Sequence, residues 1–148
     1  MKVLLISANT EKINMPTLPL GLASVAAATR RAGHEGAILD LMFEKDTRLV
    51  IEKGIKGFRS DAIGISVRNI DDQNRENQKF LLEPIRKIIG GCRSLSDAPI
   101  VLGGAGYSIF PKTTLSYLGA DMEIQGEGEV AFPFLLERLA RNGELSRV

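Results

Sequence analysis

Two glycine-rich segments are the groups in this sequence best suited to contact a ligand. The first is Gly103-Gly104-Ala105-Gly106, which follows a buried-strand pattern and precedes two hydroxyl-bearing residues, Tyr107 and Ser108. Because glycine has no side chain, its peptide groups can come close to a large ligand, although glycines also serve simply to turn the chain. Four consecutive small residues exceed what a turn needs, so we favour the close approach of a ligand.

The second segment, Gly126-Glu127-Gly128-Glu129, begins the last predicted helix. Carboxylates at a helix N-terminus complement the helix dipole, and this alone would explain both acids. The same carboxylates would repel a phosphate at that terminus. A ligand that meets this loop should therefore present sugar or base groups, which hydrogen-bond to carboxylates and to peptide groups.

The only histidine and the only cysteine are poor candidates for chemistry. His34 lies in the predicted turn before the second strand, at the edge of the sheet opposite to the one where ligands bind. Cys92 continues the apolar stripe of a helix and is interpreted as a small core residue. A single cysteine cannot form an intramolecular disulfide, which favours a cytoplasmic protein.

Several enzyme and carrier motifs are absent. The chain has no phosphate-binding P-loop and no nucleophile elbow of the G-x-S-x-G type. A phospho-receiver would need acidic residues directly after the first and third strands, where this chain has Ser7-Ala8-Asn9 and Ser66-Val67-Arg68. Lys and Arg total 19 against 18 Asp and Glu, and no apolar run approaches membrane length. We therefore expect neither a nucleic acid nor a membrane as partner.

Alternating strand and helix patterns must position these segments. Apolar runs predict four strands and a weaker fifth, at Val3–Ser7, Ala37–Asp40, Ala62–Val67, Ile100–Leu102 and Asp121–Gln125. Helical patterns lie between them: one begins at Pro19 and ends at Gly33, a less certain one covers Thr47–Phe58, one runs from Leu81 to Cys92, and the last runs from Phe132 to a stop at Gly143. Pro84 either kinks the third helix or marks its start.

The order βαβαβαβαβα predicts one α/β domain over residues 1–148. It should be a flavodoxin-like, doubly wound, three-layer α/β/α structure with five parallel strands in the order 2-1-3-4-5. Its carboxyl edge would gather both glycine segments, the residues after the third strand, and the long loop Asn9–Leu18. This loop exceeds the usual connection of about 2–6 residues, as functional loops often do. Small residues make the helix after it slim, so a broad, flat ligand could lie over this edge.

At these residues the sequence resembles the cobalamin-binding domain that precedes the catalytic barrel of cobalamin-dependent radical S-adenosylmethionine enzymes. Five stretches match in family order and cover nearly the whole chain: Leu18–Ala26, Ala32–Glu35, Ile63–Val67, Ile100–Ser108 with Pro111, and Gly126–Glu129. Each stretch alone is weak, whereas five at the right spacing are fairly specific.

The resemblance implies a cobalamin-binding module without catalytic residues of its own, whose corrin lies over the carboxyl edge and whose nucleotide tail enters a crevice beside strands 4 and 5. It implies that Ser66, Gly103 and Gly104 line the tail channel and that Gly126, Glu127 and Gly128 flank the far end of the tail. The residues it implies near the corrin are Pro19, Leu20, Arg68 and Asn69. The loops at the same edge add Asn9, Ala105, Gly106 and Tyr107 as candidate cofactor-binding residues.

Departures from the family pattern refine these expectations. The D-x-H-x-x-G motif that supplies a histidine to cobalt in other cobalamin proteins is missing, so we expect no histidine lower ligand. Arg68 stands where relatives have a leucine, and either contacts the corrin amides or a phosphate, or faces solvent. The three-cysteine iron–sulfur motif is also missing, which suggests an N-terminal domain excised from a longer radical enzyme. The [4Fe-4S] cluster and S-adenosylmethionine would then belong to a C-terminal radical domain, the expected partner.

Two other interpretations stay open on the sequence alone. A flavodoxin-like carrier or sensor could bind a flavin or a nucleotide at the same edge of the same fold. A ligand-free interaction domain would bind neither of these nor cobalamin.

Overall fold

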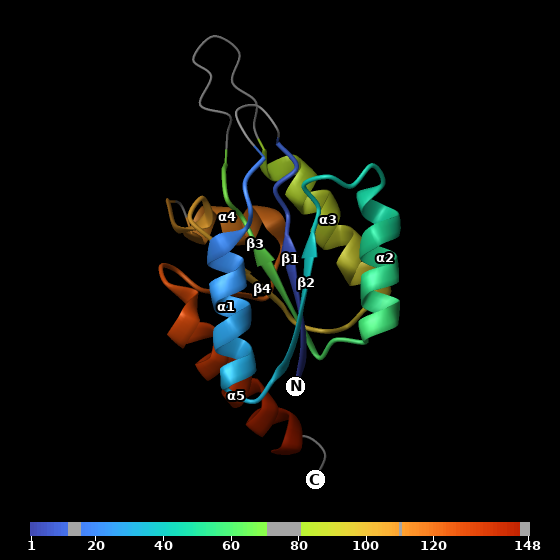
Figure 1. Cartoon of the computed structure of the whole chain (residues 1–148). Coiled ribbons are helices and arrows are strands. Elements are labelled where there is room, and N and C mark those ends of the chain that lie inside the picture. The colour runs from blue at the N-terminus through green and yellow to red at the C-terminus, as the bar shows by residue number, and fades with distance from the viewer. Residues whose placement is uncertain (12–15, 71–80, 110, 146–148) are drawn as a thin grey trace.

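A single parallel sheet of five strands runs through the centre of the molecule, in the order β2-β1-β3-β4-β5 (Figure 1). The computed structural model describes residues 1–11, 16–70, 81–109 and 111–145. The strands are β1 (Lys2–Ser7), β2 (Glu35–Asp40), β3 (Ala62–Ser66), β4 (Ile100–Gly103) and β5 (Met122–Glu123). The predicted fold and strand order are confirmed, although the fifth strand is shorter than predicted.

The helices cover both faces of the sheet and complete the predicted three layers. They are α1 (Leu20–Arg31), α2 (Thr47–Phe58), α3 (Leu82–Leu95), α4 (Pro111–Leu118) and α5 (Gly128–Leu145), with a short 3₁₀ turn η1 at Tyr107–Ile109. Helices α1 and α5 pack together on one face, and α2, α3 and α4 lie on the other (Figure 1). Among the described residues, no helix is both long and apolar enough to cross a membrane.

Helix boundaries follow local chemistry in most places. The side chain of Asp46 accepts a hydrogen bond of 3.0 Å from the amide of Leu49 and so caps α2, which has the predicted bounds. Pro84 is the third residue of α3, where a missing amide costs little, so it marks the start of the helix and not a kink. The predicted stop at Gly143 is wrong, because α5 continues to Leu145; an isolated glycine weakens a helix without ending it.

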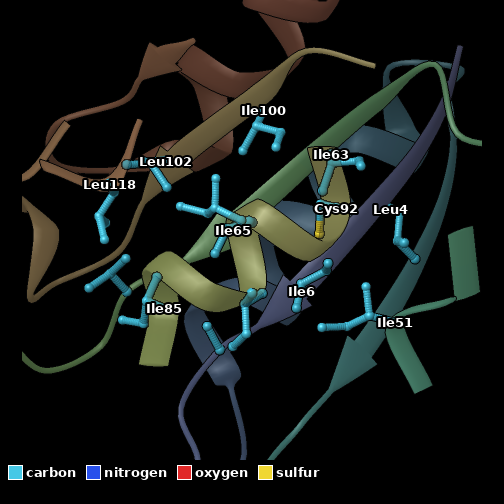
Figure 2. Packing of buried hydrophobic residues seen from close by; sticks show 14 of the residues in the cluster. Leu4, Ile6, Ile51, Ile63, Ile65, Ile85, Cys92, Ile100, Leu102 and Leu118 are labelled. Atoms are coloured by element: carbon cyan, nitrogen blue, oxygen red, sulfur yellow. The ribbon is translucent and has the colours of Figure 1, made fainter. Parts of the chain in front are cut away.

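The larger hydrophobic core lies between the sheet and the helices α2, α3 and α4. Ile6, Ile63 and Ile65 project from the strands toward Ile85 and its neighbours on α3 (Figure 2). Cys92 belongs to this cluster with none of its surface exposed, and burial raises the pKa of its thiol to about 11. It is a core residue, as predicted, and not a reactive thiol.

The second core, between the sheet and helices α1 and α5, is smaller. On β1 it contains Val3 and Leu5, which alternate along the strand with residues of the larger core. From the helices it contains Leu22, Phe132 and Leu136. These residues fill the amino-terminal part of this face. Toward the carboxyl edge the face is incompletely filled, and the candidate site lies there.

Two glycines with open space around them test the helix assignments. Gly90 lies on the exposed side of α3, and a Cβ atom there would meet nothing within 4 Å. We expect Gly90→Ala to raise the free energy of unfolding by about 1 kcal/mol, because alanine restricts the unfolded chain and favours helix.

Gly119 is the matched control, since its Cβ position is equally open but its φ is +70° at the end of α4. We expect Gly119→Ala to lower the free energy of unfolding by about 1 kcal/mol, the cost of a left-handed conformation. Urea unfolding of both variants measures the difference. Equal effects of the two substitutions would contradict the helix boundaries described here.

Candidate binding site

A cavity of about 740 Å³ opens at the carboxyl edge of the sheet, on the face that α1 and α5 cover. Its floor comes from β1, β3 and β4, and its walls come from α1, α5 and the loops that follow these strands. This volume falls within the range of about 300–1,000 Å³ that is usual for small-molecule sites. The cavity also lies at the sheet edge where doubly wound folds bind their ligands.

Strand register arranges the floor of the cavity in two rows. Ser7 pairs with Ser66 and Ser66 pairs with Gly103, so these residues form one row at the end of the strands. One pleat deeper, Leu5 pairs with Gly64 and Gly64 with Val101. All six residues line the cavity because side chains two residues apart share a face. The outer row consists of small residues with two hydroxyls, and the inner row is apolar.

The hydroxyls of the outer row are free to meet a ligand. Neither the Ser7 nor the Ser66 hydroxyl has a hydrogen bond to any residue that the structure describes. The hydroxyl of Thr17, also in the lining, is buried and lacks a partner within the described ranges. Polar atoms that the protein leaves unpaired at the wall of a cavity are suited to bind polar groups of a ligand.

Glycines allow close contacts between the elements that surround the cavity. A Cβ atom on Gly128 would lie 2.9 Å from Cγ2 of Val25, so α5 begins in close contact with α1. A Cβ atom on Gly64 would lie 2.6 Å from Cδ2 of Leu5 and 3.3 Å from the ring of Phe132. Glycine in the middle of β3 therefore allows these two side chains to close over the strand.

Two of the glycines after β4 are needed by the protein itself. Gly104 has φ +106°, and a Cβ atom there would lie 2.5 Å from the carbonyl oxygen of Val67. A Cβ atom on Gly106 would lie 2.5 Å from the carbonyl oxygen of Arg68. Both glycines let the loop after β4 pack against the backbone that follows β3. In contrast, a Cβ atom on Gly103 would meet only the carbonyl oxygen of Ile124, at 3.7 Å.

Ser108 joins the two glycine segments. Its hydroxyl donates a hydrogen bond of 3.1 Å to the carbonyl oxygen of Gly104 and accepts one of 3.0 Å from the amide of Gly126. The loop after β4 and the loop before α5 are thus held together at the mouth of the cavity. Sequence analysis gave Ser108 no more than a free hydroxyl.

The structure brings most of the predicted site residues together. Eleven of them line the cavity: Asn9, Pro19, Leu20, Ser66, Arg68, Gly103, Gly104, Ala105, Gly126, Glu127 and Gly128. Asn69 and Gly106 lie in the adjoining loops without lining it, and Tyr107 is wholly buried in the larger core. Of the long loop Asn9–Leu18, residues 12–15 lie outside the described residues.

Sequence analysis missed the apolar part of the lining. Leu5, Gly64, Val101 and Phe132 appeared only as strand and helix residues, yet they line the deeper part of the cavity. The signal that could have found them is strand parity, since each lies two residues before a predicted edge residue or faces the same side of the sheet. The register that aligns β1, β3 and β4 could not be predicted from the sequence.

His34 lies away from the cavity. The Nδ1 atom of His34 is 3.3 Å from the N-terminal amine, at the amino edge of the sheet, and burial lowers the pKa of its imidazole. Within the described part of the chain, no three His, Cys, Asp or Glu side chains gather in a group that could hold a metal ion.

Comparison with known families decides between the ligands that this edge could take. Residues 6–136 match the model of the B12 binding domain, which covers most of the chain. The chain belongs to the B12-binding domain family. The flavin or nucleotide carrier considered above is not favoured, because the matched family is a family of B12-binding domains.

Two relatives of this B12-binding domain are a methyltransferase and a methylase. It is 28% identical over 141 residues to tryptophan 2-C-methyltransferase of Streptomyces laurentii. The alignment covers 95% of this chain and 24% of the relative. It is 30% identical over 139 residues to hopanoid C-3 methylase of Methylococcus capsulatus, covering 93% of this chain and 25% of the relative. The chain thus spans about a quarter of the length of these relatives.

A solved structure agrees with the fold and the family. The radical S-adenosylmethionine methyltransferase TsrM from Kitasatospora setae, with cobalamin and a [4Fe-4S] cluster bound, superposes with a TM-score of 0.90. The match has 29% sequence identity and covers 95% of this chain and 25% of that one. The resemblance to cobalamin-binding domains of radical enzymes is therefore confirmed.

Substitutions at the adjacent residues Gly103 and Gly104 distinguish a glycine that the fold of the B12-binding domain requires from one that only lines the cavity. We expect Gly104→Ala to lower the free energy of unfolding by about 2 kcal/mol or more, because the new methyl group collides with the Val67 backbone at a strained φ. Gly103→Ala should change it by less than about 1 kcal/mol, since its methyl group enters open cavity space. Guanidinium unfolding compares the two. A larger loss for Gly103→Ala would contradict the described packing of this loop.

Proposed function

We propose that this chain holds cobalamin with the nucleotide tail in the cavity and the corrin across its mouth. The main support for the proposal is the arrangement of the cavity floor, with an outer polar row and an inner apolar row of residues. Hydroxyls near the edge suit the polar sugar and phosphate of the tail, and the apolar row beneath suits its aromatic base. Bound there, cobalamin supplies a cobalt ion able to carry an alkyl group.

The residues around the cavity fit this ligand by their size and chemistry. Ser66 and Gly103 are proposed to line the tail channel, and Gly126, Glu127 and Gly128 to flank the tail at the start of α5. Leu18 and Leu20 are 77% and 71% exposed at the mouth, where an apolar ring edge would cover them. Arg68 is exposed beside them, and its guanidinium has no partner among the described residues, so it is free to bind an amide or a phosphate.

The protein's part in the chemistry would be to bind, orient and shield the cofactor. We propose that this domain works with a radical S-adenosylmethionine domain of the same protein, which would hold the [4Fe-4S] cluster and S-adenosylmethionine. The methyltransferase relatives and their greater length support this proposal. Methyl transfer or a related radical reaction would be the activity of the whole protein. A cytoplasmic location and cofactor binding by Asn9, Asn69, Ala105, Gly106 or Tyr107 stay predictions.

Binding of hydroxocobalamin tests the proposal directly. We expect the purified chain to co-elute with the coloured cofactor in gel filtration and to retain it on dialysis. The substitution Gly103→Val should weaken binding at least about tenfold, because its side chain would occupy the tail channel while the strand accepts a β-branched residue.

The matched control for Gly103→Val is Ile100→Val, at a residue of the same strand that packs in the larger core and does not line the cavity. This variant should keep the wild-type affinity, since its side chain points away from the cavity. Circular dichroism confirms that both variants are folded. Unchanged affinity in a folded Gly103→Val protein would show that the cavity is not the cobalamin site.

Replacement of the only histidine tests the nature of the lower cobalt ligand. His34 lies at the opposite edge of the sheet from the cavity, so we expect His34→Ala to leave the visible spectrum of the bound cofactor unchanged. With the tail base in the cavity and no imidazole available, electron paramagnetic resonance of the bound cobalt(II) form should lack nitrogen splitting. A change on His34→Ala, or a nitrogen triplet, would be evidence against this arrangement.

A further inference from the structure

We infer that the cavity discriminates between corrinoids by their lower base, and prefers an apolar benzimidazole to a purine. This inference rests on the proposed function, because it assumes that the tail occupies the cavity. It concerns the chemistry of the deep end of the cavity, where the base would lie, and not the corrin at the mouth.

Among the residues that the structure describes, the side chains at the deep end offer a base no hydrogen-bonding partner. The inner row of the floor consists of Leu5, Gly64 and Val101, and the walls above it are formed by Val25 and Phe132. Leu5 and Val101 are 1% and 2% exposed, so a group that reaches them is removed from water. The hydroxyls of the lining belong to the outer row and to the loops.

The backbone groups of the floor strands also cannot hydrogen-bond to a base. The three floor strands are paired in register with their neighbours through Leu5, Gly64 and Val101, so their amide and carbonyl groups take part in the parallel ladder. A purine carries an amino or carbonyl group and additional ring nitrogens that lose their hydrogen bonds to water on entering such a space. A dimethylbenzimidazole carries methyl groups at the corresponding edge, which gain from burial there.

The shape of the floor favours a flat ring as well. Because Gly64 has no side chain, Leu5 and the ring of Phe132 approach each other over β3. A planar base could stack on this surface and contact the face or edge of the aromatic ring. Glu127 and Glu129, whose carboxylates could accept hydrogen bonds from a purine amino group, are exposed and half-buried, respectively, in the segment that begins α5, unlike the buried residues of the inner row.

Affinities for three corrinoids test the inference: cobalamin, its adenine-tailed analogue, and cobinamide, which has no nucleotide tail. Equilibrium dialysis followed by visible absorbance gives the dissociation constants. An apolar pocket rejects an unpaired polar group only moderately, so we expect cobalamin to bind about 10–100-fold more tightly than the adenine-tailed analogue. Cobinamide should bind more weakly than cobalamin, because it leaves the cavity empty.

A matched pair of variants locates the selectivity. Val101→Thr replaces a methyl group of the deep row by a hydroxyl of nearly the same size, and should reduce the preference for cobalamin over the adenine-tailed analogue by about threefold or more. Val3→Thr makes the same change on the same face and in the same apolar cluster, but at a residue that does not line the cavity. It should leave the ratio of affinities at its wild-type value, whatever it does to stability.

The outcomes separate this inference from the proposed function. Equal binding of cobalamin and the adenine-tailed analogue, or tighter binding of the latter, would overturn the selectivity while leaving cobalamin binding intact. Equal binding of cobalamin and cobinamide would show that the cavity does not take the tail and would overturn the inference. If no corrinoid binds, the proposed function itself fails.

Discussion

The site depends on the contact between the chain segments that follow β3 and β4. The amide of Val67 donates to the carbonyl oxygen of Gly103 at 2.8 Å, and the carbonyl oxygen of Val67 accepts from the amide of Gly106 at 3.0 Å. These bonds extend the pairing of two strands beyond the sheet. They need glycine at 104 and 106, because any side chain there would meet the opposing backbone. The loop is therefore rigid before a ligand arrives, which lowers the entropy cost of binding.

The two faces of the sheet divide the tasks of stability and binding. Large aliphatic side chains fill the face covered by α2, α3 and α4 and exclude water from it (Figure 2). The other face has glycine at 64, 103 and 128, where the larger core has isoleucine and leucine. An unfilled space gives up dispersion contacts and apolar burial, so the cavity has a stability cost that the filled face must offset. A cofactor that fills the space would recover part of that cost.

Much of this arrangement could be predicted from the sequence, and the part that could not has a physical reason. The alternation of apolar runs and helix patterns predicts the fold, since crossovers are right-handed and five strands suit the order 2-1-3-4-5 better than the six-stranded dinucleotide-binding order. The edge residues follow from the strand ends. Tyr107 shows the limit, because a hydroxyl-bearing residue beside four small ones resembles a ligand contact, whereas the 3₁₀ turn directs it into the core. The direction of a loop side chain depends on backbone dihedrals that composition does not specify.

Doubly wound sheets of this kind carry many functions, and the residues at the strand ends distinguish them. Acidic residues at the ends of β1 and β3 would create a negatively charged site able to bind a cation. Here both strands end in serine, β4 ends in glycine, and the row beneath is apolar. Among the described residues, the two rows of the floor carry no charged side chain, so the floor is suited to bind a ligand and to exclude solvent from it. A floor of this kind suits a ligand that brings its own reactive group, as a cofactor does.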